Sequence, residues 1–261
     1  MFRRSIVVLT ISALALFATG CNEAKKYKAR GMEKMQARQY GDAIHEFDRA
    51  IRADDADAEL YYYRAYAWLS LQDAQQALRD VERTLQIKPQ HSEARILRGY
   101  AHLELGNLDL ALADLDEAVR LLPDNAQAYQ TRGMTRMARG DYTKALADFE
   151  KAISLDPRQS QGYNNRAWLR ATARDATFRD GKQAVADATT ASDLLNENEA
   201  KYACLDTLAA AHAEAGEFEK AAEIQQQAID HAPPTGIASM KSRLELYKSR
   251  KPYHLAEGKF H

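Results

Sequence analysis

A small residue recurs every 34 residues along most of this chain, and that period constrains the fold more than any other feature. The column comprises Gly31, Ala65, Gly99, Gly133 and Ala167. A fixed period of this length indicates stacked supersecondary units, each of which buries its apolar face only against its neighbours. Two further columns of small residues keep the same period: Ala43, Ala77, Ala111 and Ala145, and then Ala50, Thr84, Ala118 and Ala152.

Within each unit, the apolar residues are spaced as on two amphipathic helices. In the unit 126–159, for example, Tyr129 and Met137 fall on one face of the first helix. Gly140 follows at a place where glycine can take the left-handed conformation that ends a helix. We therefore predict an all-α chain of helix hairpins. A proline closes three of the units and turns the chain into the next one: Pro89, Pro123 and Pro157.

Opposite charges also follow the repeat. In each of the first four units, an arginine on the first helix is followed sixteen positions later by an acidic residue on the second helix. In the fifth unit, the acidic residue lies five positions further along the chain because of an insertion. The last unit lacks both charges, with Leu208 and Ile224 instead. We expect the two positions to face each other as structural ion pairs. The pairs are Arg30 with Glu46, Arg64 with Asp80, Arg98 with Asp114, Arg132 with Asp148, and Arg166 with Asp187.

The period and the order of these columns resemble the tetratricopeptide repeat (TPR). The resemblance covers about residues 24–235 and implies an all-α, right-handed TPR solenoid of six helix–turn–helix repeats. The fifth repeat departs from the pattern by an insertion within 173–181. After the repeats, residues 236–261 are expected to form a capping helix over Ile237–Ser249 and a tail. The expected repeats are 24–57, 58–91, 92–125, 126–159, 160–201 and 202–235.

The first residues are typical of a secretory signal peptide spanning 1–20. Arg3 and Arg4 precede an apolar run over 6–18, which is short for a membrane span, and small residues follow. Cys21 resembles the lipobox cysteine of bacterial lipoproteins, which implies acylation of its thiol and leaves 21–23 as a short tether. Ordinary cleavage, giving a secreted protein with a free thiol, and an uncleaved anchor are the alternatives.

The residue after this cysteine bears on localisation. An aspartate directly after the lipobox cysteine would resemble an inner-membrane retention signal, but this chain has Asn22 at that position. The lipoprotein resemblance therefore implies a bacterial cell-envelope protein, anchored in the outer membrane and facing the periplasm.

The sequence contains few features that are typical of catalysis, metal binding or nucleic-acid binding. Charged residues make up 28% of the chain and nearly balance, with a formal net charge of -1, which argues against a nucleic-acid partner. The seven histidines are scattered, and no metal-ligand, phosphate-binding or nucleophile motif occurs. We therefore expect a protein that is not an enzyme and has no catalytic residues, cofactor, metal or small-molecule substrate.

The TPR resemblance places a partner-binding groove on the first helices of the repeats. Tyrosine, tryptophan and methionine are typical of interface hot spots and adaptable surfaces, and amides can bind a peptide backbone. An alternative for Tyr66 and Leu103 is packing between repeats, and the tail Lys251–His261 with Tyr253 could itself fold back into the groove. The predicted groove residues are Tyr62, Tyr66, Leu69, Ile96, Tyr100, Leu103, Gln127, Gln130, Met134, Met137, Asn164 and Trp168.

The function expected from these features is a lipid-anchored scaffold or adaptor that binds a protein or peptide of the envelope in its groove. Two alternatives stay open. The chain could self-associate as a structural protein without a client, or it could be the regulatory subunit of an envelope enzyme. The sequence leaves the oligomeric state open.

Overall fold

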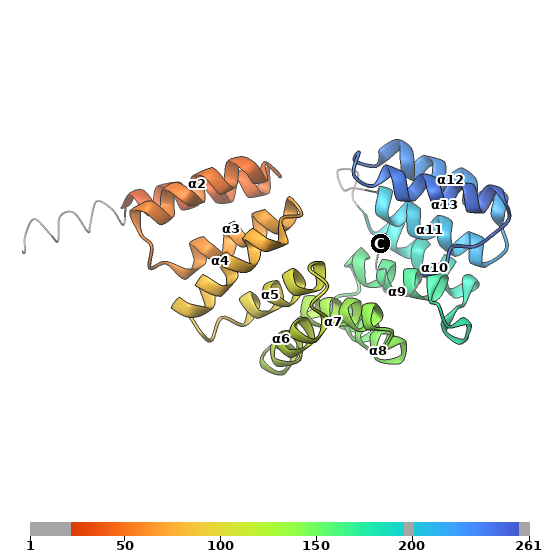
Figure 1. Ribbon diagram of the computed structural model, residues 1–261, viewed down its shortest axis with the longest axis horizontal. Coiled ribbons are helices and arrows are strands. Elements are labelled where there is room, and N and C mark those ends of the chain that lie inside the picture. The colour runs from red at the N-terminus through yellow and green to blue at the C-terminus, as the bar shows by residue number, and fades with distance from the viewer. Residues whose placement is uncertain (1–21, 196–200, 256–261) are drawn as a thin grey trace, which may run out of the picture. The chain divides into compact units, whose positions relative to one another are not determined.

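The structure is a computed structural model that describes residues 22–195 and 201–255. The predicted signal peptide, Cys21 and the end of the tail lie outside these residues. Within them, all regular elements are helices (Figure 1). None of the described helices is both long enough and apolar enough to cross a membrane.

The contacts divide the chain into two compact units, of which the first ends at Leu121. Its described part begins with helical residues 22–36. Five further helices follow: α2 (Tyr40–Ala53), α3 (Ala58–Ser70), α4 (Ala74–Ile87), α5 (Ser92–Glu104) and α6 (Leu108–Leu121). Each helix from α2 onward packs against the next, and the first helices of neighbouring hairpins, α3 and α5, also touch.

The second unit begins at Leu122. Its helices are α7 (Ala126–Arg139), α8 (Tyr142–Leu155), α9 (Ser160–Thr172), the short 3-10 helix η1 (Ala176–Phe178), α10 (Gly181–Asp193), α11 (Tyr202–Glu214), α12 (Phe218–His231) and α13 (Ile237–Lys248). The first helices of consecutive hairpins touch again, α7 with α9 and α9 with α11. The last helix, α13, packs against α12, as expected of a cap.

The columns of small residues lie at the closest helix contacts, as the period predicts. All three columns are buried. Where the first column holds glycine, a large side chain on the second helix fills the space, so that an added Cβ would clash. That Cβ would lie 2.5 Å from Phe47 at Gly31, 2.6 Å from Leu115 at Gly99 and 2.6 Å from Phe149 at Gly133. Where the column holds Ala65, the smaller Val81 shares its buried cluster.

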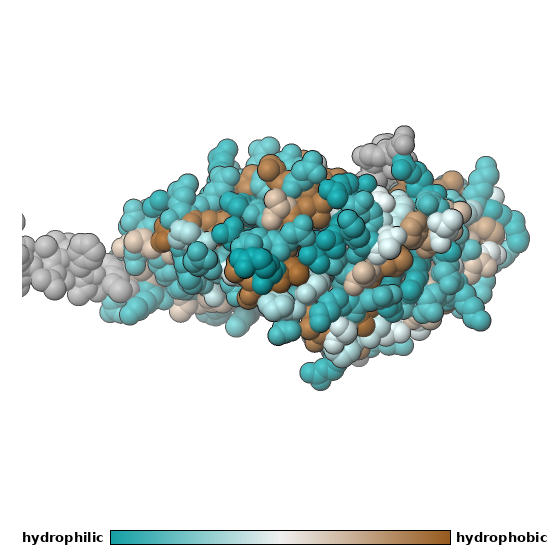
Figure 2. Space-filling view, turned by 90° about the horizontal axis from the view of Figure 1, so that it is seen from below, coloured by the Kyte–Doolittle hydropathy of each residue, from teal (hydrophilic) through white to brown (hydrophobic). Residues whose placement is uncertain are grey.

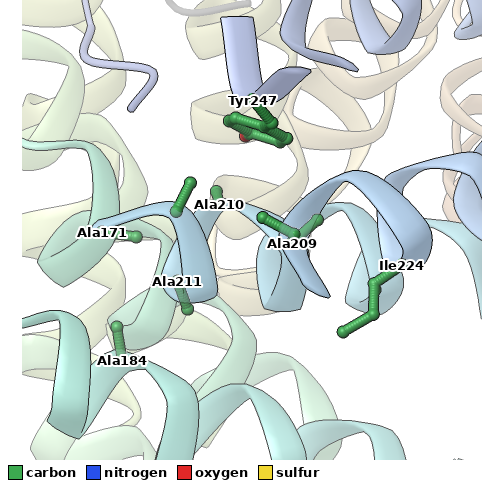
Figure 3. Packing of buried hydrophobic residues seen from close by; sticks show 9 residues of the cluster. Ala171, Ala184, Ala209, Ala210, Ala211, Ile224 and Tyr247 are labelled. Atoms are coloured by element: carbon green, nitrogen blue, oxygen red, sulfur yellow. The ribbon is translucent and has the colours of Figure 1, made fainter. Parts of the chain in front are cut away.

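An alanine-rich core joins the helices at the end of the second unit (Figure 3). Alanines of α9, α10 and α11 let these helices approach closely, because the side chains between them are small. Tyr247 of α13 lies over α11 in Figure 3 and is 1% exposed. The cap thus buries a large aromatic ring on the last apolar face of the repeats.

The expected ion pairs form in four repeats. Each of the four arginines donates two hydrogen bonds to its aspartate, at 2.6 to 3.0 Å. The pairs are Arg64 with Asp80, Arg98 with Asp114, Arg132 with Asp148, and Arg166 with Asp187. The expected pair of Arg30 and Glu46 is wrong: Glu46 instead accepts a hydrogen bond from Arg49, one turn along its own helix, at 3.2 Å.

The turns inside the hairpins explain why the fifth repeat differs. Gly106, Gly140 and Gly216 end first helices with φ of 75°, 86° and 82°, and Arg38 and Gln72 take the left-handed conformation in the first two repeats. In the fifth repeat, α9 ends without a left-handed residue, and Ala173 is extended. The backbone N–H of Asp180, at the far end of the insertion, donates to the carbonyl of Arg170 at 2.9 Å. One of the carbonyl groups at the C-terminal end of α9 therefore accepts its hydrogen bond from the far end of the insertion.

Candidate partner-binding surfaces

The predicted groove residues of the first unit lie on α3 and α5, which touch each other. We call this set the tyrosine surface. Its members differ in exposure: Tyr66 is 48% exposed, Tyr62, Leu69 and Tyr100 are half-buried, and Ile96 and Leu103 are buried. Leu103 is thus buried, as expected of a residue that packs between repeats, whereas Tyr66 is exposed. The surface consists of Tyr62, Tyr66, Leu69, Ile96, Tyr100 and Leu103.

Tyr62 is held in place by aromatic packing. Its ring stacks on His91 with centroids 4.8 Å apart. The Nδ1 of His91 in turn accepts the backbone N–H of Ala94 at 3.3 Å and caps α5. A side chain fixed in this way loses little rotamer freedom when a partner binds, which favours affinity.

The hydroxyls of Tyr62 and Tyr100 stay protonated over the physiological pH range. Burial, with a further contribution from the Glu93 carboxylate, raises the pKa of Tyr62 to about 12. Burial and Glu104 also raise the pKa of Tyr100. The Tyr62 hydroxyl can therefore donate a hydrogen bond to a partner, whereas the Tyr100 hydroxyl already donates to Glu104, and both side chains present apolar ring faces.

The predicted residues of the second unit lie on α7 and α9, which also touch. We call this set the amide surface. Gln127 is exposed, Met134 and Trp168 are half-buried, and Gln130, Met137 and Asn164 are buried. The surface consists of Gln127, Gln130, Met134, Met137, Asn164 and Trp168.

Two buried amides of this surface have atoms without a hydrogen-bond partner within the described part of the chain. Neither polar atom of the Gln130 amide has a partner, nor does the Oδ1 of Asn164. A buried polar group left unpaired costs about 1–3 kcal/mol. Gln130 and Asn164 occupy the same position in consecutive repeats, 34 residues apart. The unpaired atoms therefore lie at equivalent places on the two helices, below the exposed surface.

Trp168 is not free, because the chain's own C-terminal segment covers it. The ring of Tyr253 lies 6.0 Å from it, centroid to centroid. The guanidinium of Arg243 lies within 5.6 Å of the Trp168 centroid and 5.4 Å of the Tyr253 centroid. The tail therefore folds back onto a predicted groove residue, at least over residues 251–255, where the described part of the chain ends.

A buried ion pair that the sequence did not predict lies beside this site. Arg243 of α13 donates two hydrogen bonds to Asp206 of α11, at 2.9 and 2.7 Å, and Gln225 donates a third at 2.7 Å. Both charged residues are 7% exposed. Arg243 lies on the apolar face of the expected capping helix, which is an indication of such a pair in the sequence. The capping helix is outside the 34-residue period, so the period does not predict the partner of Arg243. Among the described residues, no three His, Cys, Asp or Glu side chains are placed to hold a metal.

The hairpins, their period and their buried small columns define a helical-repeat protein of the α-solenoid class. Within that class its repeats are tetratricopeptide repeats, as the sequence predicts. Family profiles of the tetratricopeptide repeat match residues 28–92, 64–132, 126–159 and 203–230. Repeats of this family mediate protein–protein interactions, and the fold is typically a non-catalytic scaffold.

Solved structures of the same fold cover most of the chain. A tetratricopeptide repeat protein from Parabacteroides merdae matches with a TM-score of 0.68 and 21% identity, covering 86% of this chain and 84% of that one. PilW, a widely conserved type IV pilus biogenesis factor, matches with a TM-score of 0.65 and 17% identity, covering 84% and 98%. MamA from Desulfovibrio magneticus matches with a TM-score of 0.53 and 23% identity, covering 66% of this chain and 94% of that one. These identities show a shared fold alone. No curated protein matches the sequence.

Proposed function

We propose that this chain is a lipid-anchored scaffold of the bacterial envelope that binds a partner protein or peptide through the first helices of its repeats. The observation that carries the proposal is the exposure of Tyr66. An aromatic side chain that is 48% exposed, on the groove-facing position of α3 and beside Tyr62 and Tyr100, is typical of an interface hot spot. Hydrophilic residues predominate on the face drawn in Figure 2, with apolar patches between them.

The amide surface supports the same function. An extended peptide offers one N–H and one C=O per residue, and these groups can pair with amide side chains. Gln127, which is exposed, can make such contacts, whereas the unpaired atoms of Gln130 and Asn164 are buried behind it. Met134, which is half-buried on α7, provides an adaptable apolar contact, while Met137 belongs to the core beneath it.

The envelope location rests on the lipobox-like Cys21, for which we propose acylation and outer-membrane anchoring facing the periplasm. The similarity to PilW, a pilus biogenesis factor, is compatible with a role in envelope assembly. Since the first helical residues begin at 22, an acylated Cys21 would hold the first repeat close to the lipid surface.

Photo-crosslinking in cells tests the scaffold function. With p-benzoylphenylalanine at position 66, we expect crosslinks dominated by one other envelope protein, identified by mass spectrometry. The matched control places the same probe at Glu82, which is exposed on the second helix α4, and should not capture that protein.

The outcomes separate the candidate functions. Crosslinks from position 66 only to further copies of the chain would replace the scaffold by the self-associating structural protein. Equal capture of one protein from positions 66 and 82 would mean that the tyrosine surface is not the binding site.

Lipid anchoring is tested separately. In the variant Cys21→Ser, no thiol is available for acylation, so we expect the protein to move from the membrane pellet to the soluble periplasmic fraction. Fractionation after a high-salt wash, followed by immunoblotting, measures the change. A variant that still sediments with membranes after the wash would contradict the anchor, and Cys204→Ser serves as the matched thiol control.

A further inference from the structure

The described end of the chain turns back onto the second unit after α13. Arg250, with φ of 57°, reverses the chain, and the N–H of Lys251 donates to the carbonyl of Leu246 at 2.9 Å. The five residues 251–255, which we call the tail segment, form no helix or strand. Tyr253 is the first of them to reach the amide surface, through the ring contact with Trp168.

The next two residues make directional contacts. The Nε2 of His254 lies 2.7 Å from the Oε2 of Glu214, while the Nε of Arg179 donates to the other oxygen of that carboxylate at 2.9 Å. The N–H of Leu255 donates to the carbonyl of Thr172, the last residue of α9, at 2.9 Å, and the Leu255 side chain is 8% exposed.

These contacts are those of a bound extended peptide. The Tyr253 ring contacts an aromatic residue of the groove, and the main-chain N–H of Leu255 donates to a carbonyl at the end of α9. Leu255, the aliphatic residue two positions after Tyr253, is buried. Trp168 occupies the same repeat position as Tyr66 in the tyrosine surface and Met134 in the amide surface. The tail segment therefore covers a position at which other repeats present side chains available to a partner.

We infer that the surface formed by Trp168, Glu214, Arg243 and the carbonyl end of α9 is a docking site for an extended segment with an aromatic residue two positions before an aliphatic one, and that residues 251–255 occupy it in the free chain. The inference rests on the proposed scaffold function and names its partner chemistry. A partner segment of this pattern must displace the tail segment to reach Trp168.

The tail segment is suited to displacement. Its described contacts with the site are one main-chain hydrogen bond, the contacts of the Tyr253 ring with Trp168 and Arg243, the short contact of His254 with Glu214, and the burial of Leu255. Segments with few buried contacts open with free energies far below that of global unfolding. A competing segment gains affinity when the tail is removed, because a site that is only fractionally free binds more weakly by that fraction.

Fluorescence anisotropy with a peptide of the chain's own sequence tests the site. The probe is fluorescein-labelled Ser-Arg-Lys-Pro-Tyr-His-Leu-amide, corresponding to residues 249–255. The full chain without its signal peptide is compared with its variants. Tyr253→Ala should bind the probe about tenfold or more tightly than the wild type, because the competing tail is weakened. Lys251→Ala, in an exposed tail residue, is the control and should match the wild type.

Two further measurements complete the test. Adding Trp168→Ala to Tyr253→Ala should abolish the gain, and a probe with alanine in place of its tyrosine should not bind. Circular dichroism verifies that each variant is folded. If Tyr253→Ala does not fold, hydrogen exchange on the wild type decides: the Leu255 amide should exchange much faster than the α11 amides.

Equal affinity of the wild type and folded Tyr253→Ala, or a Leu255 amide protected as long as those of α11, would show that the tail segment is a fixed part of the fold and would overturn the inference. Crosslinking from position 66 distinguishes this result from failure of the scaffold function. If position 66 captures its partner while the peptide result is negative, the scaffold stands and the docking site falls.

Discussion

Asp206→Ala is expected to lower the free energy of unfolding by about 3–5 kcal/mol, because it leaves the Arg243 guanidinium buried without its counter-charge. Asp206 accepts three hydrogen bonds, two from Arg243 and one from Gln225, and the substitution removes all of them at once. Since Arg243 connects α13 to α11, the second unit should lose its cap before its other helices. Urea unfolding followed by circular dichroism measures the loss.

Two controls identify the cause of that loss. Glu245→Ala breaks an exposed pair with Lys248 on the same helix and should cost less than about 1 kcal/mol. The triple variant Asp206→Leu, Arg243→Met and Gln225→Leu removes both buried charges and the amide that bonds to Asp206, and should recover most of the stability, because apolar residues can replace a buried ion pair at little cost. A single variant within about 1 kcal/mol of the wild type would mean that Arg243 reaches water when its partner is removed.

Phe149→Ala is expected to destabilise the chain by a similar amount, about 3–5 kcal/mol, because it empties the space between α7 and α8. Phe149 is fully buried, and its ring fills the volume that Gly133 leaves open. The measurement is again chemical denaturation, with the slope of the unfolding curve compared between variants to verify that the unfolding transition itself is unchanged.

A compensating pair tests whether the two positions act together. Gly133→Ala alone should cost about 1–3 kcal/mol, because its Cβ would lie 2.6 Å from the ring of Phe149. Combining Gly133→Ala with Phe149→Val copies the Ala65 and Val81 arrangement of the second repeat and should restore part of the loss. If the two substitutions add without interaction, the size match between the positions has no energetic role.

The features that follow the period could be read from the sequence. Helices that cross at close distance need a small residue at a fixed spacing, so the buried columns were predictable. The Arg98 and Asp114 pair and its equivalents in three other repeats were predictable for the same reason. The first repeat departs: Glu46 accepts a hydrogen bond from Arg49, one turn along its own helix, and the guanidinium of Arg30 lies 5.9 Å from the Tyr27 ring centroid instead.

The features outside the period could not be read in this way. Asp206 and Arg243 meet only because α13 packs on the last hairpin, and no repeat spacing relates them. The contact of Tyr253 with Trp168 depends on the chain reversal at Arg250, where a non-glycine residue takes a positive φ. The choice of groove residues stays a prediction, although the structure shows that Tyr66 and Gln127 are exposed and Gln130 is buried.

The matching of Gly133 with Phe149, and of Ala65 with Val81, also limits how such a gene can be rearranged. A crossover between two repeats that falls inside a hairpin would join the first helix of one to the second helix of another. Alanine would then meet phenylalanine, or glycine would meet valine, leaving a clash or a void. A crossover at a loop between hairpins keeps each matched pair together. The whole hairpin is therefore the smallest piece that can be copied, lost or exchanged without repair elsewhere.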